Sequence, residues 1–508
     1  MKLITTVLII ATTILNFQFA GASESKLIEQ YTYPKIRKII RVNKDSIIGA
    51  NSRFLSSVGK FDSKVLWEVE IGDPIPDQMW KERFETYNDF IVYTRFSKEG
   101  PALFCVNISN GKVVWKRTFD STRFCSDPVV IDKKIYVVVR KGESNLVNQY
   151  DWSGKLIGSK KLSIDRIIKK VDNLFLCFSD KYKLVCYDDL WNQKWLIEGC
   201  IPSMVEGNDV IDIGNGQIVY FTHDCGDDTD KIFQISLQDG NKKTLASFEG
   251  YIYGLPIYKN GNIYTIINYI DYKNTKNPPV TQNDNGMKLL SLNLKTYEAK
   301  TIESKSRMSF CISDNNLFLH DGKLKCLDLS FNPKWECDFP ELALVWSDAF
   351  YNEYNAFYSV FSGSSNIKKF LLAPTIVQYS LTGGYYKIEQ TAKEYQFKSL
   401  LLNQTTYISS VDLVLPLNGR VVWNGSNKTI IIDVFIGKTA KYHIEMQINN
   451  PTATVNGKKV QIDPKNPKIT PIIKDGRTMI PLRFLAENLG CTVKWIAETK
   501  TIIVTYQP

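Results

Sequence analysis

Short stretches of alternating apolar and polar residues, each ended by a polar turn, occupy the chain from about residue 35 to residue 365. The segment ALFCVNISNGKVVWKRTF (102–119) is typical: an apolar strand, an Asn-Gly turn and a second strand that contains a tryptophan. LVCYDDLWNQKWLIEG (184–199) and LKCLDLSFNPKWECDF (324–339) repeat this order. Alternation with a period of two, broken by Asn-Gly and Asp-Gly turns, predicts β-hairpins.

The hairpin unit recurs along the chain. Shorter strand–turn–strand pieces such as DPVVIDKKIYVVV (127–139) lie between the units. Four short strands per unit, repeated at about 40–50 residues, are typical of propeller blades. The pattern therefore predicts a mainly β protein with a seven-bladed β-propeller, eight blades being the alternative. We expect the last blade to borrow a strand, from 38–50 or from 357–363. The seven units are 63–72, 102–119, 148–162, 184–199, 232–248, 289–304 and 324–339.

The unit NGKVVW (110–115), followed by DPVVIDKKIYVV, resembles the repeat of quinoprotein-type, PQQ-like β-propellers over roughly residues 35–365. In that family the tryptophan of a blade's last strand packs between neighbouring blades. Quinoprotein dehydrogenases hold their cofactor with a calcium ion and a disulfide between adjacent cysteines, and this chain has no adjacent cysteines. The resemblance therefore implies the fold, and we expect no cofactor. Trp67, Trp115, Trp195 and Trp335 match the tryptophan position, which is replaced at Gly158, Leu245 and Ile302.

The last quarter of the chain contains a second repeat, at a shift of 72 residues: 405–432 aligns with 477–504. In the second copy Pro481 precedes the run LRFLAENLG, whose leucines share one helical face and whose glycine suits the end of a helix. We expect one helix cradled by strands, with Trp495 closing the core. The first copy reads SSVDLVLPLNG at this point, so its helix stays an open question.

The run GRTMIPLRF (476–484), with Glu487, Leu489-Gly490 and Trp495, resembles the copper amine oxidase N-terminal-like domain, a stalk domain of exported bacterial proteins. In copper amine oxidases this domain projects away from the copper and quinone centre, so the resemblance implies no copper site. Such domains are commonly attached to exported propellers and are often inferred to face the cell wall. We expect Arg483 and Glu487, at positions i and i+4, to form a surface ion pair; a functional role is the alternative.

The N-terminus has the features of a signal peptide: Lys2, an apolar run, and an A-x-A site that predicts cleavage after Ala22. An uncleaved anchor is the alternative, and no later stretch is long and apolar enough to span a bilayer. We therefore expect an exported, soluble mature chain. The predicted organisation is a signal peptide (1–22), a propeller (23–370), a degenerate stalk-type repeat (375–446) and a small α+β stalk domain (447–508).

The chemistry-bearing residues nominate no catalytic, cofactor-binding or metal site. The net charge of +10 comes from scattered basic residues, which argues against a nucleic-acid interface. The acidic loop Asp224–Asp230 could hold Ca²⁺ or be a solvated turn, the commoner case. Two cysteine pairs have hairpin spacing and form disulfides only if they lie opposite each other; buried thiols are the alternative. These pairs are Cys177 with Cys186 and Cys311 with Cys326, and the three histidines, His223, His320 and His443, fall in different repeats or domains.

The favoured hypothesis is a non-catalytic exported protein. The propeller would present a face to a ligand or partner, and the C-terminal units would hold it at the cell envelope, against an envelope protein or polysaccharide. The alternative is an exported enzyme, either a quinone-dependent dehydrogenase or a glycan-active propeller. A third hypothesis is an envelope assembly scaffold, because some propellers that resemble this one use one face to hold other proteins.

Overall fold

The computed structural model describes most of the chain, but only two residues of the predicted signal peptide. Within residues 1–25 only β1 (Thr13–Ile14) is described, and it pairs in parallel with β27 (Ala299–Ser304). The described ranges are 13–14, 26–33, 36, 38–51, 53–72, 83–119, 125–141, 144–179, 183–199, 201–202, 210–224, 229–249, 251–268, 286–306, 308–313, 315–338, 350–353, 356–360, 367–389, 391, 393–437 and 439–507.

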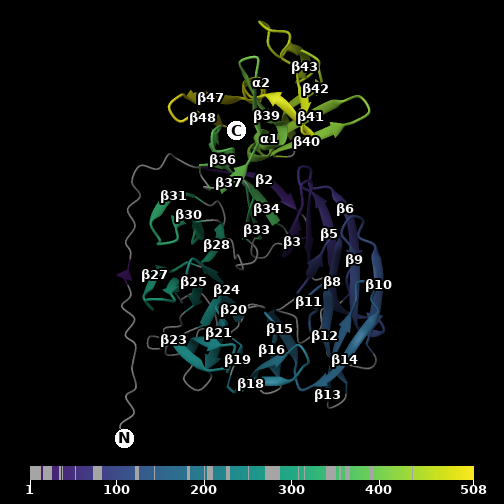
Figure 1. Cartoon of the computed structure of the whole chain (residues 1–508), viewed down its shortest axis with the longest axis vertical. Helices are drawn as coiled ribbons and strands as arrows, with labels where there is room; N and C mark the ends of the chain where they lie inside the picture. Colours follow the sequence, from purple (N-terminus) through teal and green to yellow (C-terminus); the bar gives the residue numbers. More distant parts are fainter. Residues whose placement is uncertain are drawn as a thin grey trace.

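Residues 26–373 form a ring of antiparallel sheets, which we call the ring (Figure 1). Each of its first four sheets is built from four consecutive strands. They are β3 (Lys38–Val42), β4 (Ser46–Ala50), β5 (Phe54–Gly59) and β6 (Val65–Glu70); β7 (Glu85–Tyr87), β8 (Phe90–Ser97), β9 (Gly100–Asn107) and β10 (Val113–Thr118); β11 (Val129–Ile131), β12 (Lys134–Lys141), β13 (Ser144–Tyr150) and β14 (Leu156–Leu162); β15 (Arg166–Val171), β16 (Leu174–Ser179), β17 (Lys183–Asp188) and β18 (Gln193–Ile197).

The next three sheets continue the same plan, and two of them carry a short extra strand: β19 (Ile201–Pro202) pairs with β21, and β1 pairs with β27. They are β20 (Val210–Gly214), β21 (Gln217–Asp224), β22 (Thr229–Ser236) and β23 (Lys242–Glu249); β24 (Tyr251–Lys259), β25 (Asn262–Asn268), β26 (Met287–Asn293) and β27; β28 (Ser309–Ser313), β29 (Asn316–His320), β30 (Lys323–Asp328) and β31 (Pro333–Asp338).

The eighth sheet closes the ring with a strand from the other end of the chain. β32 (Phe350–Glu353), β33 (Ala356–Val360) and β34 (Ile367–Ala373) are joined by β2 (Lys26–Tyr33), in the order β2-β34-β33-β32. The predicted β-propeller is confirmed. The described residues of the ring form eight sheets, the number in the alternative of eight blades; six have four strands and two have a short fifth strand added.

The borrowed strand is not one of the two that the sequence predicted. Residues 38–50 form the first two strands of the first sheet, and residues 356–360 form an interior strand of the eighth. Because β2 supplies the outer strand of the eighth sheet from about 340 residues away, that sheet has no local tryptophan-type turn, and the count of such turns stopped at seven. Tyr33, fully buried, fastens the closure by donating its hydroxyl to the Lys60 carbonyl at 2.7 Å.

The blade tryptophans insert between sheets as the PQQ-like repeat implies. Trp115 is 9 % exposed, and its Nε1 donates to the Trp152 carbonyl of the next sheet at 2.9 Å. The turn that it meets contains Gly154, with φ +78°, and a Cβ on that residue would lie 2.7 Å from the indole ring. Trp67 and Trp195 repeat the arrangement, donating to the carbonyls of Ile108 and Leu237.

Of the two alternatives for the cysteine pairs, the described residues show free thiols: eight cysteines in them are free, and seven of these are buried. Cys186 lies opposite Leu176 and Cys177 opposite Val185, so the two sulfur atoms point to opposite faces of the sheet. Cys311 and Cys326 both pair with Phe318 from either side. Two strand spacings, about 9–10 Å, separate them, which is too far for a disulfide.

Residues 375–506, which we call the C-terminal region, contain three further sheets and two short helices. The predicted helix of the second copy is present as α2 (Leu482–Asn488), and the first copy has a shorter equivalent, α1 (Ser410–Val414) followed by a 3₁₀ turn (Leu415–Leu417). The sheets are β37-β36-β35-β48-β47, β38-β39-β46-β45 and β40-β41-β42-β43-β44. Their strands are β35 (Thr375–Ser380), β36 (Tyr385–Ile388), β37 (Lys393–Gln396), β38 (Ser399–Leu402), β39 (Thr405–Ser409), β40 (Gly419–Asn424), β41 (Thr429–Ile436), β42 (Thr439–Gln447), β43 (Thr452–Val455), β44 (Lys458–Gln461), β45 (Ile472–Lys474), β46 (Arg477–Pro481), β47 (Cys491–Ile496) and β48 (Thr501–Tyr506).

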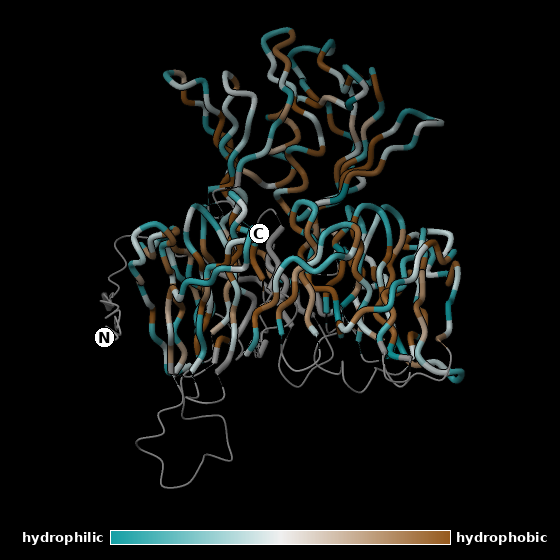
Figure 2. The backbone as a smooth tube through the Cα atoms, turned by 60° about the horizontal axis from the view of Figure 1, so that its bottom comes forward, coloured by the Kyte–Doolittle hydropathy of each residue, from teal (hydrophilic) through white to brown (hydrophobic). Residues whose placement is uncertain are grey.

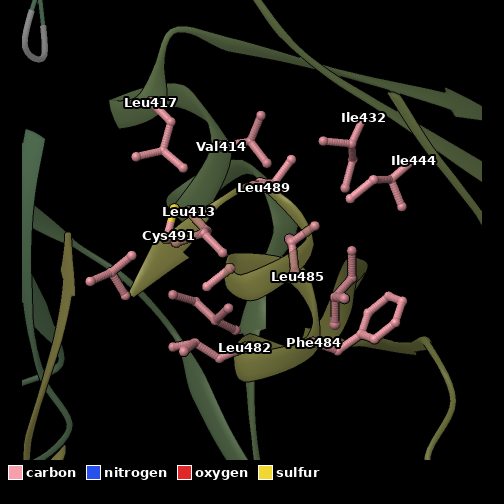
Figure 3. Packing of buried hydrophobic residues seen from close by; sticks show 14 of the residues in the cluster. Leu413, Val414, Leu417, Ile432, Ile444, Leu482, Phe484, Leu485, Leu489 and Cys491 are labelled. Atoms are coloured by element: carbon pink, nitrogen blue, oxygen red, sulfur yellow. The ribbon is translucent and has the colours of Figure 1, made fainter. Parts of the chain in front are cut away.

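The two copies are related by an approximate two-fold axis and exchange strands. Ile408 pairs with Ile480, its equivalent 72 residues later, so the axis passes through the β39–β46 ladder. Each five-stranded sheet combines the last two strands of one copy with the first three of the other, because β41 pairs with β42 and β48 pairs with β35. Both copies share one hydrophobic core around α1 and α2 (Figure 3), which makes them a single folded body.

The C-terminal region projects from one side of the ring, and apolar segments run through both bodies (Figure 2). The contact is buried: Phe435 stacks on Phe61 of the ring with centroids 5.1 Å apart. Lys369 of β34 is almost fully buried, lies over the Phe61 ring and donates to the Asn418 side chain. An aromatic pair and a buried, hydrogen-bonded lysine resist relative movement of two bodies more strongly than a flexible linker would.

Candidate functional site

A groove of about 510 Å³ opens on the C-terminal region. Four elements surround it: the β38–β39 turn, β44 with the loop that follows, helix α2, and the β47–β48 hairpin. Its polar lining residues are Gln404, Thr405, Thr406, Gln461, Asp463, Arg483, Glu487 and Asn488; its apolar ones are Val460, Ile462, Pro464, Ile469, Pro481, Leu482, Phe484, Val493, Trp495 and Ile502.

The sequence around α2 fixes one wall of the groove. Pro481 is the N-cap residue, with φ −55°, and the helix turns Leu482 and Leu485 into the core. The chain leaves the helix at Gly490, whose φ of +76° suits glycine and whose missing side chain makes room for Tyr442, because a Cβ there would lie 2.2 Å from the phenol oxygen. This short helix leaves its opposite face, with Arg483 and Glu487, open to the groove.

Trp495 does not close the core as predicted. Its side chain stands on the face of β47 that also carries Cys491 and Val493, but it is 47 % exposed. In contrast to the blade tryptophans, it donates no hydrogen bond to any part of the chain that the structure describes. Packing of the core ends at Val493, so Trp495 becomes a wall of the groove.

The predicted ion pair between Arg483 and Glu487 is also absent. Both side chains are exposed and line the groove, and neither forms an ion pair with a described residue. Residues i and i+4 of a helix can meet, but an exposed pair gains little free energy over solvation of each charge. The alternative that the sequence left open, a functional role for these residues, agrees with their place in the groove.

Sequence reasoning missed the far wall of the groove. Gln404 and Gln461 lie in the β38–β39 turn and at the end of β44, far apart in the chain. No pattern in the sequence connects them, because the strand exchange between the copies brings them together. The one signal in the sequence was the tryptophan at the same position of both copies, Trp423 and Trp495. The structure shows that Trp423 is also exposed, at 44 %. A tryptophan kept exposed in both copies is unusual for a core residue.

The remaining candidate residues lie apart from the groove and from one another. His320 is buried in β29, and burial lowers its pKa to about 4. His223 lies in β21. Residues 225–228 of the acidic loop fall outside the described residues. Asp230 is fully buried, and its carboxylate accepts a hydrogen bond from the Ile252 amide of the next sheet. Asp230 therefore stabilises a blade interface.

His443 belongs to a charged network on the sheet β40–β44. Asp433, whose side chain is 6 % exposed, accepts hydrogen bonds from His443 Nδ1 at 2.7 Å and from Arg420 at 2.8 Å. His443 Nε2 lies 3.1 Å from Glu445 Oε1. The hydrogen bond to Asp433 raises the pKa of His443, opposed by partial burial. The network holds three neighbouring strands in register.

The described residues contain neither a cluster of metal ligands nor a membrane-spanning helix. No group of three or more His, Cys, Asp or Glu side chains in them has the arrangement of a metal site. Among the same residues, no helix has the length and hydropathy that a membrane crossing requires.

Two family models match this chain over separate ranges. The model described as outer membrane protein assembly factor BamB matches residues 55–243 of the ring. The model described as copper amine oxidase N-terminal domain matches residues 387–504. Both predicted resemblances are confirmed. The BamB-like range covers the first sheets of the ring, and the amine-oxidase-like range includes every element around the groove.

Two solved structures are similar to this chain at low sequence identity. BamB from Moraxella catarrhalis is 10% identical, with a TM-score of 0.44, over 68% of this chain and 97% of that one. Sqt1 from Saccharomyces cerevisiae is 9% identical, with a TM-score of 0.45, over 69% of this chain and 100% of its own. No curated protein sequence matches significantly.

Proposed function

We propose that the chain is an exported, non-catalytic binding or scaffold protein. The ring presents a loop-lined face to a protein partner, and the C-terminal region associates with the cell envelope. The family model that matches residues 55–243 carries the description of an assembly factor, which supports a scaffold role for the ring. The charge pattern and the N-terminal apolar run support export.

The observation that carries the proposal is the junction between the two bodies. Phe435 inserts among ring residues, Lys369 reaches from β34 to Asn418, and the Asn316 side chain of β29 donates to the Thr391 carbonyl. Two binding bodies held in this way fix the distance and orientation between whatever each one binds. That is the property a scaffold needs, whereas an enzyme needs convergent reactive groups in one site.

Co-sedimentation of the purified chain (residues 23–508) with isolated cell walls tests the proposal. We expect the protein in the pellet, no soluble sugar released from the walls, and no quinone absorbance band. Retention no greater than that of a control protein of similar charge would remove the envelope association. Release of sugars, or a quinone band with substrate turnover, would replace the proposal with the enzyme alternative.

The junction has its own test. Phe435→Ala removes the stacked phenyl group and leaves the groove unchanged. Retention on cell walls should therefore persist, while the ring and the C-terminal region move independently of each other. Small-angle scattering should then show a broader distribution of distances than for the unaltered chain. An unchanged distribution would mean that the aromatic contact does not hold the two bodies.

A further inference from the structure

The groove of the C-terminal region combines a flat aromatic wall with a rim of uncharged and charged hydrogen-bonding groups. Trp495 presents nearly half of its surface, and the buried Phe484 also lines the groove. Gln404 and Gln461 carry amide groups that can both donate and accept, and neither is hydrogen-bonded through its side chain within the described residues. A rigid, partly apolar groove with a few polar groups is the usual form of a small-ligand subsite.

The charges and polar groups of the groove lining exclude two classes of ligand. Arg483 contributes one positive charge, and Asp463 and Glu487 contribute two negative ones. A polyanion such as a nucleic acid or a phosphate-rich polymer needs a concentration of basic side chains, which this groove does not have. An amphipathic helix needs a continuous apolar trough, and here polar groups interrupt the apolar lining.

We propose that this groove binds a chain of uncharged pyranose sugars from the cell-wall glycan, with Trp495 as the platform on which a sugar ring stacks. The C–H bonds of a pyranose face carry partial positive charge, which the negative face of the indole attracts. The ring hydroxyls both donate and accept hydrogen bonds, as do the amides of Gln404 and Gln461. The proposal rests on the proposed envelope association and names the polymer that it engages.

The first copy of the repeat offers a matched control. Trp423 is the equivalent of Trp495 and is almost equally exposed. At the positions equivalent to Arg483, Glu487 and Asn488, however, that copy has valine, leucine and proline at 411, 415 and 416. The first copy therefore has the stacking platform without the polar rim, and it does not bind the sugar chain.

The experiment measures binding of three soluble hexasaccharides to the purified chain by isothermal titration calorimetry: chitohexaose, cellohexaose and maltohexaose. We expect at least one to bind at one site per chain. Trp495→Ala should weaken that binding about tenfold or more, as truncation of a central aromatic contact does. Glu487→Ala should weaken it less, and Trp423→Ala should leave it unchanged. Melting temperatures of all variants are measured to show that each one folds.

Three results would overturn the proposal: no binding of any hexasaccharide by the unaltered chain, binding that Trp495→Ala does not weaken, or an equal loss in Trp423→Ala. Wall co-sedimentation of the same proteins separates this proposal from the one on which it rests. Walls that retain the unaltered chain and Trp495→Ala equally, with no hexasaccharide bound, leave the envelope association standing and remove the sugar groove. Hexasaccharide binding without wall retention would keep the sugar groove and remove the envelope association.

Discussion

Replacing the blade tryptophan Trp115 by alanine tests the stacking of sheets in the ring. The indole is 9 % exposed and lies between the second and third sheets, with its Nε1–H held by the Trp152 carbonyl. Truncation of a buried tryptophan costs about 3–5 kcal/mol. With an unfolding entropy of about 2.1 cal/mol/K per residue over the ring of roughly 350 residues, the melting temperature should fall by about 4–7 °C.

A second substitution isolates the contact between the ring of Trp115 and the neighbouring turn. Gly154→Ala places a Cβ 2.7 Å from the indole at φ +78°, so it adds a steric clash to the backbone strain. Gly261→Ala has the same φ of +78° with no atom within 4 Å, so it carries the strain alone. We expect Gly154→Ala to cost more than Gly261→Ala, and the excess to vanish when Trp115→Ala is also present.

Differential scanning calorimetry of the four single and double variants measures these shifts on one protein preparation. The ring and the C-terminal region can give separate unfolding transitions. The melting temperature of the ring transition is the quantity compared among the variants. A shift below about 1 °C for Trp115→Ala, well outside the range expected from its burial, would refute the inter-sheet role. Additive effects of Trp115→Ala and Gly154→Ala would refute the direct contact.

Three further predictions concern the closure, the thiols and the charged network. A chain that starts at Ile36 lacks β2, so the ring should lose its outer closing strand and elute from gel filtration as larger or aggregated species; a monomer with unchanged melting temperature would contradict the closure. Cys177 and Cys186 should both be alkylated after unfolding without reductant, since they point to opposite faces; a mass that corresponds to a disulfide would contradict this register. Asp433 raises the pKa of His443, so the stabilisation is present below about pH 6.5 and is lost as the pH rises through the raised pKa. The melting temperature of the C-terminal region should therefore fall between about pH 5.5 and 8.5 more steeply than in His443→Gln, and equal slopes would rule out this role.

The repeat pattern predicted most of the ring because each blade is built from local hairpins. Polar turns mark the units in the sequence itself, and four of the seven units also carry the tryptophan of the last strand. The closing strand was missed because β2 pairs with β34, and nothing near Lys26–Tyr33 in the chain records that partner. The same distinction explains the cysteines: spacing placed Cys177 and Cys186 in one hairpin, but a register difference of one residue put them on opposite faces.

The C-terminal region was predictable as a duplication but not as an exchange of strands. Apolar periodicity and Gly490, which are local signals, located α2, whereas the helix of the first copy, α1, stayed an open question. The 72-residue shift could not show that β48 of the second copy pairs with β35 of the first, because these strands lie more than a hundred residues apart in the chain. Trp495 was assigned to the core by its position in the repeat, but the hydrophobic core includes Val493 at its edge and not Trp495, which is 47 % exposed.

The location and N-terminus of the native protein test the central claim most directly. Cells of the source organism are fractionated, the protein is detected with an antibody against the ring, and its first residues are sequenced. The account predicts a chain that begins at Ser23 in the cell-wall fraction. A chain that begins at Met1 and stays in the cytoplasmic fraction would contradict it.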